Sequence, residues 1–259
     1  VPLPVDLSGT IAVVLEGHPG VDIDGDGAIA GRSDTVAVTN AIAYFGVDGA
    51  TPEPRRNAVA IERCADCHKQ LALHGNNRTD KPEACAVCHN PDATDTLVRL
   101  PATECTDELG PDDEAIDMKY MIHAIHAGTT GVCGFRSSAH PYFDVTYPGQ
   151  LNNCEGCHLP GGYYPVEPDV LLGTTIDAND PTTPTDDRVI SPNTAVCWSC
   201  HRDTLAVEHM RQNGGDFDAG KTADSALVSA GVETCALCHG PGRTADVAVL
   251  HGVERFRDD

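Results

Sequence analysis

Hydrophobic residues in this chain gather in short runs that are separated by polar, glycine-rich and proline-rich stretches. Two β-prone runs, Thr10–Leu15 and Thr35–Phe45, predict strands near the N-terminus. Residues 113–128 predict a helix, because acidic residues open the stretch and a terminal glycine can end it in a left-handed conformation. A second, shorter helix is predicted over Thr204–Gln212, where two glycines follow closely.

The rest of the pattern indicates loops rather than long elements. The stretch Val166–Thr194 is rich in Asp, Pro and Thr, which predicts a surface loop. No run of 18 apolar residues occurs, so the pattern predicts no transmembrane segment. Aromatic residues make up only 5% of the chain, whereas Gly and Pro number 25 and 18. This composition predicts a thin core and much irregular structure.

One pattern, Cys-x-x-Cys-His, recurs five times and uses ten of the twelve cysteines. In a c-type haem site the two thiols add across the haem vinyl groups, and the adjacent His becomes the proximal iron ligand. A zinc site would pair Cys-x-x-Cys units without requiring these histidines, and a redox dithiol would occur once. The pattern therefore predicts five covalently attached c-type haems, around which short helices would wrap. Motifs 1 to 5 comprise Cys64, Cys67 and His68; Cys85, Cys88 and His89; Cys154, Cys157 and His158; Cys197, Cys200 and His201; and Cys235, Cys238 and His239.

Seven histidines lie outside the motifs, which is enough to give every iron a second imidazole. An iron with both axial positions filled binds no substrate and relays single electrons. His18 and His140 each precede a proline away from the motifs and are left out of the expected ligand set. His123 and His126 share one face of the predicted helix. The predicted distal ligands are His74, His123, His126, His209 and His251.

The chain begins Val1-Pro2-Leu3 without an initiator Met or a signal peptide, which favours a mature product or a fragment of a longer protein. Covalent haem attachment follows export, so we expect a periplasmic or extracellular compartment in which disulfides can form. Cys105 and Cys133 are the two cysteines outside the motifs, and we expect a disulfide between them rather than two free thiols. Closing the loop between them would contribute roughly 3–4 kcal/mol on the chain-entropy account.

An acidic loop lies between the two predicted strands. Asp22, Asp24 and Asp26 occupy the first three ligand positions of an EF-hand-type loop, and Gly27 stands at its turn. Ser33 replaces the glutamate expected at the twelfth position. The loop is therefore a possible Ca²⁺ site, with a plain acidic β-turn as the alternative.

The formal net charge is −22, from 39 acidic and 17 basic side chains. Haem propionates would add further negative charge. This balance argues against nucleic acid and anionic membrane surfaces as partners. It favours either cationic partners or a solvated acidic surface with no specific partner.

Several segments resemble the OmcA/MtrC-type outer-membrane multihaem cytochromes. They are the segment Leu73–Asp80, Cys88–Pro91, Met121–His126, Tyr147–Cys154, Cys238–Arg243, and Gly17-His-Pro with the acidic loop that follows it. Members of that family usually carry ten haems, in two pentahaem domains that alternate with two split β-barrels. The resemblance implies that this chain is one half: the tail of a β-domain and one pentahaem domain. It also implies bis-His haems, a cell-surface location, electron delivery to minerals or flavins, and distal ligands in the stretches that hold the histidines given above.

The expected fold is mostly irregular, with short α-helices around five haems and a small β-rich N-terminal segment. We expect the β-rich segment over residues 1–54 and the pentahaem domain over residues 55–259. The expected function is electron transfer at the outer cell surface, with other cytochromes, copies of the chain and extracellular acceptors as partners. A subunit of a polymeric cytochrome filament is the alternative. A multihaem reductase is less expected, because no Cys-x-x-Cys-Lys variant occurs and spare histidines abound.

Overall fold

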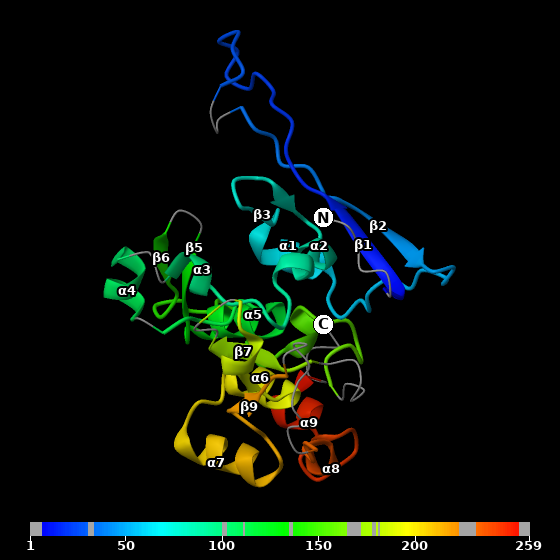
Figure 1. Cartoon of the computed structure of the whole chain (residues 1–259), viewed down its shortest axis with the longest axis vertical. Coiled ribbons are helices and arrows are strands. Elements are labelled where there is room, and N and C mark those ends of the chain that lie inside the picture. The colour runs from blue at the N-terminus through cyan, green and yellow to red at the C-terminus, as the bar shows by residue number, and fades with distance from the viewer. Residues whose placement is uncertain are drawn as a thin grey trace. The chain divides into compact units, whose positions relative to one another are not determined.

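The structure of the protein is a computed structural model, and Figure 1 shows the whole chain. It describes residues 7–30, 34–99, 103–110, 112–134, 137–164, 172–177, 180, 182–222 and 232–253. The chain divides into two units, which we describe separately. Unit 1 comprises residues 1–88 and 155–163, and unit 2 comprises residues 89–154 and 164–259. The predicted boundary at residue 54 stays a prediction.

Unit 1 contains a two-stranded antiparallel sheet, a short hairpin and two helices (Figure 1). Its elements are β1 (Gly9–Leu15), β2 (Ala41–Val47), α1 (Ile61–His68), β3 (Ala72–Leu73), β4 (Arg78–Thr79) and α2 (Pro82–Cys88). The first predicted strand is found as β1. The second begins six residues later than predicted, because Asn40 holds the chain just before it. The Asn40 amide nitrogen donates to the carbonyls of Leu15 and Asn77, and its oxygen accepts from the Thr79 N–H at 2.6 Å.

The β1–β2 sheet has an uncovered apolar face. Ile11 pairs with Phe45, Val13 with Ala43 and Leu15 with Ala41, so these side chains share one face of the ribbon. Val13, Leu15 and Phe45 are 52%, 73% and 54% exposed. A two-stranded ribbon alone is only marginally stable in water, so covering this face would stabilise it. An exposed apolar face of this kind can bind an apolar partner.

Unit 2 contains most of the helices and two small antiparallel sheets, of order β5–β6 and β7–β8–β9. Its elements are α3 (Thr96–Arg99), α4 (Thr103–Leu109), α5 (Met118–Ala127), β5 (Gly131–Gly134), β6 (Ser138–Pro141), β7 (Thr174–Asp177), the 3₁₀ turn Pro184–Asp186, β8 (Arg188–Ile190), α6 (Pro192–Trp198), α7 (Thr204–Gln212), β9 (Ala219–Gly220), α8 (Ala236–His239) and α9 (Val247–His251). A further 3₁₀ turn, Cys154–Gly156, lies where the chain passes from unit 2 to unit 1. The predicted mixture of short helices, small β-segments and irregular chain is confirmed.

The two predicted helices are found with different accuracy. α7 has the predicted bounds. α5 ends as predicted, at Gly128 in the left-handed conformation, but its start is wrong by five residues. Asp117 caps the helix and accepts from the Lys119 N–H and from the Thr174 hydroxyl, the latter at 2.6 Å. The residues before it are held extended, because Ala115 bridges Thr94.

The prediction of a surface loop over residues 166–194 is wrong where the structure describes it. β7, β8 and the start of α6 lie in this stretch, and residues 166–171 fall outside the described part. Val189 and Ile190 are among the most buried side chains of unit 2. The composition suggested a loop because threonines line this sheet. Thr174 and Thr175 are fully buried in it as well.

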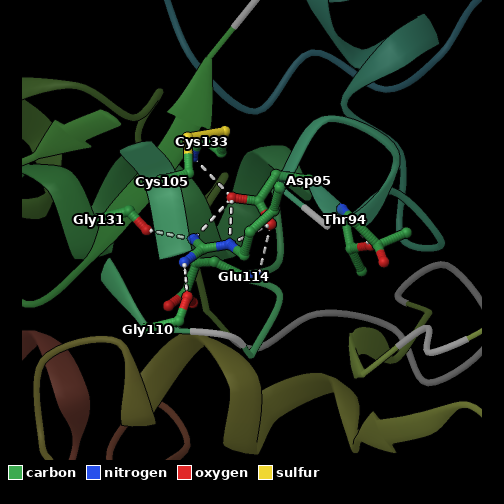
Figure 2. A network of polar contacts seen from close by, with 9 residues as sticks. Thr94, Asp95, Cys105, Gly110, Glu114, Gly131 and Cys133 are labelled. Atoms are coloured by element: carbon green, nitrogen blue, oxygen red, sulfur yellow. Dashed lines mark hydrogen bonds and ion pairs between the residues drawn. A yellow bond between two sulfur atoms is a disulfide. The ribbon is translucent and has the colours of Figure 1, made fainter. Parts of the chain in front are cut away.

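A buried ion pair holds the α3 region of unit 2 together. Arg99 and Asp95 are 1% and 2% exposed, and Arg99 donates to both Asp95 oxygens at 2.7–3.1 Å. The same carboxylate accepts from the backbone N–H groups of Glu114 and Cys133, and Arg99 also donates to the Gly131 carbonyl. Figure 2 shows these bonds beside the disulfide between Cys105 and Cys133. The Asp95–Arg99 pair therefore connects α3 with the segment at Glu114 and with strand β5.

We predict that Asp95→Asn destabilises the protein by about 3–5 kcal/mol, because it leaves the Arg99 guanidinium buried without its counter-charge. Chemical denaturation of the haem-loaded protein measures this loss. Glu208→Gln is the matched control, because Glu208 and Arg211 form a half-exposed pair on α7 that contributes at most about 1 kcal/mol. Equal losses in the two variants would contradict the assignment.

Glu114 predicts a pH dependence of stability. Burial raises the pKa of this carboxyl, and the nearby Asp95 adds to the rise, against a hydrogen bond from Tyr120 and the attraction of Arg202. The folded state therefore favours the neutral acid. The stability that the neutral Glu114 carboxyl contributes is fully present below the ordinary carboxyl pKa of about 4.3. It is lost as the pH rises through the raised pKa of Glu114 in the folded protein. We expect Glu114→Gln to abolish this loss in unfolding curves recorded across that range. Parallel curves for both proteins would refute the assignment.

Candidate functional site

The five Cys-x-x-Cys-His motifs lie on or beside short helical turns. Motif 1 is contained in α1, motif 2 begins in α2, motif 3 begins in the 3₁₀ turn, motif 4 begins in α6, and motif 5 ends with α8. Helical geometry places the two cysteines of a motif, three residues apart, on one side of the turn. None of the ten motif cysteines is fully buried. The sulfurs are therefore accessible to a prosthetic group that binds both members of each pair.

Six histidines engage one ring nitrogen, Nδ1, in a hydrogen bond to the backbone. In each, Nδ1 lies 2.6–3.1 Å from a backbone carbonyl oxygen, to which the Nδ1–H donates. This bond fixes the tautomer and leaves Nε2 unprotonated, which is the form that binds a metal. The set contains three motif histidines and three outside the motifs: His89, His158, His239, His123, His126 and His251.

The structure brings two motif histidines against two of the predicted distal ligands. The ring centroids of His201 and His251 lie 6.1 Å apart, and those of His209 and His239 lie 5.9 Å apart. Two imidazoles on opposite sides of one metal, each bound at about 2 Å, have centroids about 6 Å apart. The ring planes meet at 69° and 84°. These two pairs fit the donor set of an iron with two axial imidazoles.

The pairing is reciprocal along the chain. His209 lies on α7, which follows motif 4, yet it meets His239 of motif 5. His251 lies on α9, which follows motif 5, yet it meets His201 of motif 4. Each motif histidine therefore meets a histidine from the segment that follows the other motif. Figure 1 shows the helices concerned, α6 to α9, in the yellow to red part of unit 2.

Helix α5 carries His123 and His126 as predicted. Burial lowers the pKa of His123, and the proximity of His126 lowers it further, so the ring is held neutral. The His126 ring meets the edge of Tyr147 at 5.6 Å. The start of α5 is also next to motif 2, since the Met118 N–H donates to the His89 carbonyl at 3.1 Å. The structure thus places this helix beside a motif histidine of unit 2.

The three remaining spare histidines differ in their surroundings. His74 stands at the tip of the β3–β4 hairpin with a φ of 51°, a left-handed conformation that is costly for a non-glycine residue. His140 accepts or donates through Nε2 to the Ser138 hydroxyl at 3.1 Å, which occupies its usual metal-binding nitrogen. Nδ1 of His18 is buried without a hydrogen-bond partner. Sequence reasoning left His18 out of the ligand set, and its unpartnered nitrogen is visible only in the folded chain.

Cys64 of motif 1 lies near Cys157 of motif 3 and Cys85 of motif 2. Burial raises the pKa of the Cys64 thiol, and the thiols of Cys157 and Cys85 raise it further. Backbone bonds support this arrangement, because the Ala60 N–H donates to the Cys157 carbonyl and Val59 bridges His158. Motifs 1 and 3 are therefore neighbours within unit 1, although about 90 residues separate them in the sequence.

An aromatic and cationic cluster links motif 4 to α5, and sequence reasoning missed it. Trp198, inside motif 4, stacks on Tyr120 with centroids 5.8 Å apart. The Arg202 guanidinium lies 4.3 Å from the Trp198 ring centroid and donates to the Tyr120 hydroxyl at 2.6 Å. Because Arg202 follows His201 directly, this cluster restrains the backbone of His201, the histidine of motif 4.

The acidic loop gathers a different set of carboxylates from the one predicted. Asp22, Asp24 and Asp34 bring oxygen atoms within 4.8 Å of one another. Asp26 instead accepts from the Ala28 N–H at 2.8 Å, and Ser33 lies outside the described residues. Asp34 is 4% exposed and accepts from the Ala30 N–H. A buried carboxylate one position beyond the expected twelfth residue could not be selected from spacing alone.

The two cysteines outside the motifs lie together in unit 2. Cys105, on α4, and Cys133, on β5, are both buried and joined by an S–S bond, with Cα atoms 5.7 Å apart. They form a small hydrophobic cluster with Val98 and Ala139. No helix among the described residues is long and apolar enough to cross a membrane.

Comparisons with known proteins identify a family and two similar solved structures. Residues 56–252 match the family described as "Outer membrane cytochrome MtrC/MtrF-like, domains II/IV". The crystal structure of the outer membrane decaheme cytochrome OmcA is similar over 97% of this chain and 35% of that chain, with a TM-score of 0.55 and 20% identity. MtrC from Shewanella baltica OS185 is similar over 90% and 34%, with a TM-score of 0.50 and 18% identity.

The chain thus spans about a third of the length of each of these two structures, and identities at this level show the fold alone. No curated protein matches it. The family match, in contrast, covers well over half of the chain and includes all five motifs. The chain therefore belongs to the MtrC/MtrF-like outer membrane cytochromes, where it corresponds to domain II or IV.

Proposed function

We propose that this chain is a pentahaem electron-transfer module that acts at the outer cell surface and delivers electrons to extracellular acceptors. The observation that carries the proposal is the pair of histidine contacts, His201 with His251 and His209 with His239, at the separation that two axial ligands require. A motif histidine and a spare histidine would hold each iron from opposite sides. The same ligation is proposed for the other three motifs, with His74, His123 and His126 as the distal ligands.

The ligand set favours relay over substrate chemistry. When bound, the haems supply reversible one-electron chemistry at iron, at potentials lower than Met/His ligation would give. The thiols of each motif would hold the porphyrin covalently, and the histidines would occupy both axial positions. No position would then remain for a substrate. A multihaem reductase, which needs an open position, is the less favoured class.

The location and partners follow from the family. The name of the similar structure OmcA describes it as an outer membrane decaheme cytochrome. By analogy we propose that this chain is exported, that it acts at the cell surface or outside the cell, and that other cytochromes, metal oxides and flavins are its redox partners. Its net charge of −22 supports cationic rather than nucleic-acid or anionic lipid partners.

Two structural features are part of the same proposal. Asp22, Asp24 and Asp34 would bind Ca²⁺ through oxygen atoms, which are the ligands this ion prefers. The Cys105–Cys133 disulfide would close the α4–β5 region after export. Metal analysis of the purified protein and mass mapping without reduction test the two features. A calcium-free loop or two free thiols would refute the corresponding feature.

We predict that His209→Ala and His251→Ala each convert one low-spin ferric haem per chain to high spin, because each removes one axial ligand. Low-temperature EPR of the oxidised protein measures the conversion. His140→Ala is the matched control and should leave every haem low-spin, because its Nε2 is engaged by Ser138. A wild-type protein with a stoichiometric high-spin signal would instead support the reductase.

A filament subunit is the second candidate, and the uncovered apolar face of β1 and β2 favours it. Leu15 and Phe45 are 73% and 54% exposed on one face of a ribbon whose outer edges carry no further described strand. We predict that filaments, if formed, are dispersed by Leu15→Ser, with Leu205→Ser on α7 as the control at an equally exposed position. Negative-stain electron microscopy makes the comparison. Discrete particles from the wild-type protein would exclude this candidate.

A further inference from the structure

Glu233 is the most heavily hydrogen-bonded carboxylate among the described residues of unit 2 outside the Asp95 network, and the proposed function does not use it. It lies two residues before the first cysteine of motif 5. One oxygen accepts from the hydroxyls of Ser191 and Thr194 and from the Thr194 N–H, all at 2.7–2.8 Å. The other accepts from the backbone and side-chain nitrogens of Asn193, both at 2.8 Å.

All five donors belong to the start of α6, the helix that leads into motif 4. Ser191 and Thr194 are 0% and 1% exposed, and the bonds between them and Glu233 are partly buried. Ser191 is fixed in turn, because its hydroxyl accepts from the Asp216 N–H and its N–H donates to the Asp216 carbonyl. One carboxylate therefore joins the approach to motif 5 with the helix of motif 4.

The charge state of Glu233 suits this role. Burial would raise the pKa of the carboxyl, but the hydrogen bonds from Asn193, Thr194 and Ser191 outweigh it and lower the pKa below the ordinary value. The side chain is then an anion with five donors directed at it. Ionised acceptors form stronger hydrogen bonds than neutral ones, so this contact is stiff as well as specific.

A second contact beside Glu233 joins the same segments. Both the N–H and the hydroxyl of Thr234 donate to the Asn213 carbonyl at the end of α7. Gly214 allows the approach, because a Cβ there would lie 2.4 Å from the Val232 carbonyl oxygen. α7 carries His209, the histidine that meets motif 5. The approach to motif 5 is thus bonded both to α6 and to α7.

The contacts of Glu233 and Thr234 join the same segments that carry the two histidine pairs. His201 follows α6 and meets His251, while His239 ends motif 5 and meets His209. A rotation of the motif 5 segment relative to α6 would turn one ring in each pair. We propose that Glu233 is a positioning residue that fixes this rotation and so sets the angle between the two imidazole planes in both pairs. The proposal rests on the proposed ligation.

The test uses EPR of the oxidised, haem-loaded protein. The anisotropy of a low-spin bis-imidazole signal increases as the two ring planes approach the perpendicular. The angles of 69° and 84° therefore predict strongly anisotropic signals from the haems of motifs 4 and 5. Glu233→Gln is the variant, because it keeps the shape but turns an NH₂ group toward the Asn193 donors. We expect both signals to shift or broaden, with five haems retained by intact mass.

Two further variants separate positioning from simple stabilisation. Glu208→Gln, on the exposed face of α7, should leave the spectrum unchanged. Asn193→Asp combined with Glu233→Gln should restore the signals in part, because the new amide can donate to the new carboxylate. A Glu233→Gln protein with an unchanged spectrum would overturn the proposal, even if its melting temperature fell.

The outcomes also distinguish this proposal from the ligation on which it rests. If His209→Ala and His251→Ala remain low-spin, the ligand pairs are wrong and both proposals fail together. If those variants become high-spin while Glu233→Gln leaves the anisotropic signals in place, the ligation stands and the role of Glu233 alone is refuted. Loss of the signals in Glu233→Gln but not in Glu208→Gln supports both.

Discussion

The hydrogen bond from an imidazole Nδ1 to a backbone carbonyl is the constraint on which the candidate site depends. On α5 and α9 the carbonyl belongs to the residue four positions earlier, so the helix itself orients His123, His126 and His251. A carbonyl oxygen has a second lone pair that the helix ladder leaves unused. The bond sets the ring rotamer and tautomer together. Each of these rings is thereby held in the tautomer whose Nε2 can bind a metal.

Polar clusters carry much of the packing that an apolar core would carry in an ordinary domain of this size. Among the described residues, buried polar side chains are about as numerous as buried hydrophobic ones. Asn40, Asp95 and Glu233 each join segments that are distant in the sequence. Hydrogen bonds are directional, whereas apolar contacts are not, so such clusters fix orientation better than they supply stability. That property suits the proposed function, in which the chain holds axial ligands at set angles.

Local patterns predicted local elements well. The bounds of α7 and the left-handed end of α5 were found because capping and glycine signals act within one turn. The late start of β2 and the sheet within residues 166–194 were missed, because Asn40 and the buried Thr174 act through partners far away in sequence. The motif residues and spare histidines could be named from spacing. Which histidine meets which could not, since only the folded chain brings residue 209 to residue 239.

The reciprocal arrangement of motifs 4 and 5 has a consequence for maturation in time. Under the proposed ligation, the histidine that faces His201 follows motif 5 in the chain, so motif 4 is synthesised before its second ligand. Motif 4 would therefore stay incomplete until α9 docks, whereas His209 and His239 are both present once motif 5 has been synthesised. Under that ligation, a chain cut short before α9 would keep all five attachment motifs but would leave motif 4, and not motif 5, without its second ligand.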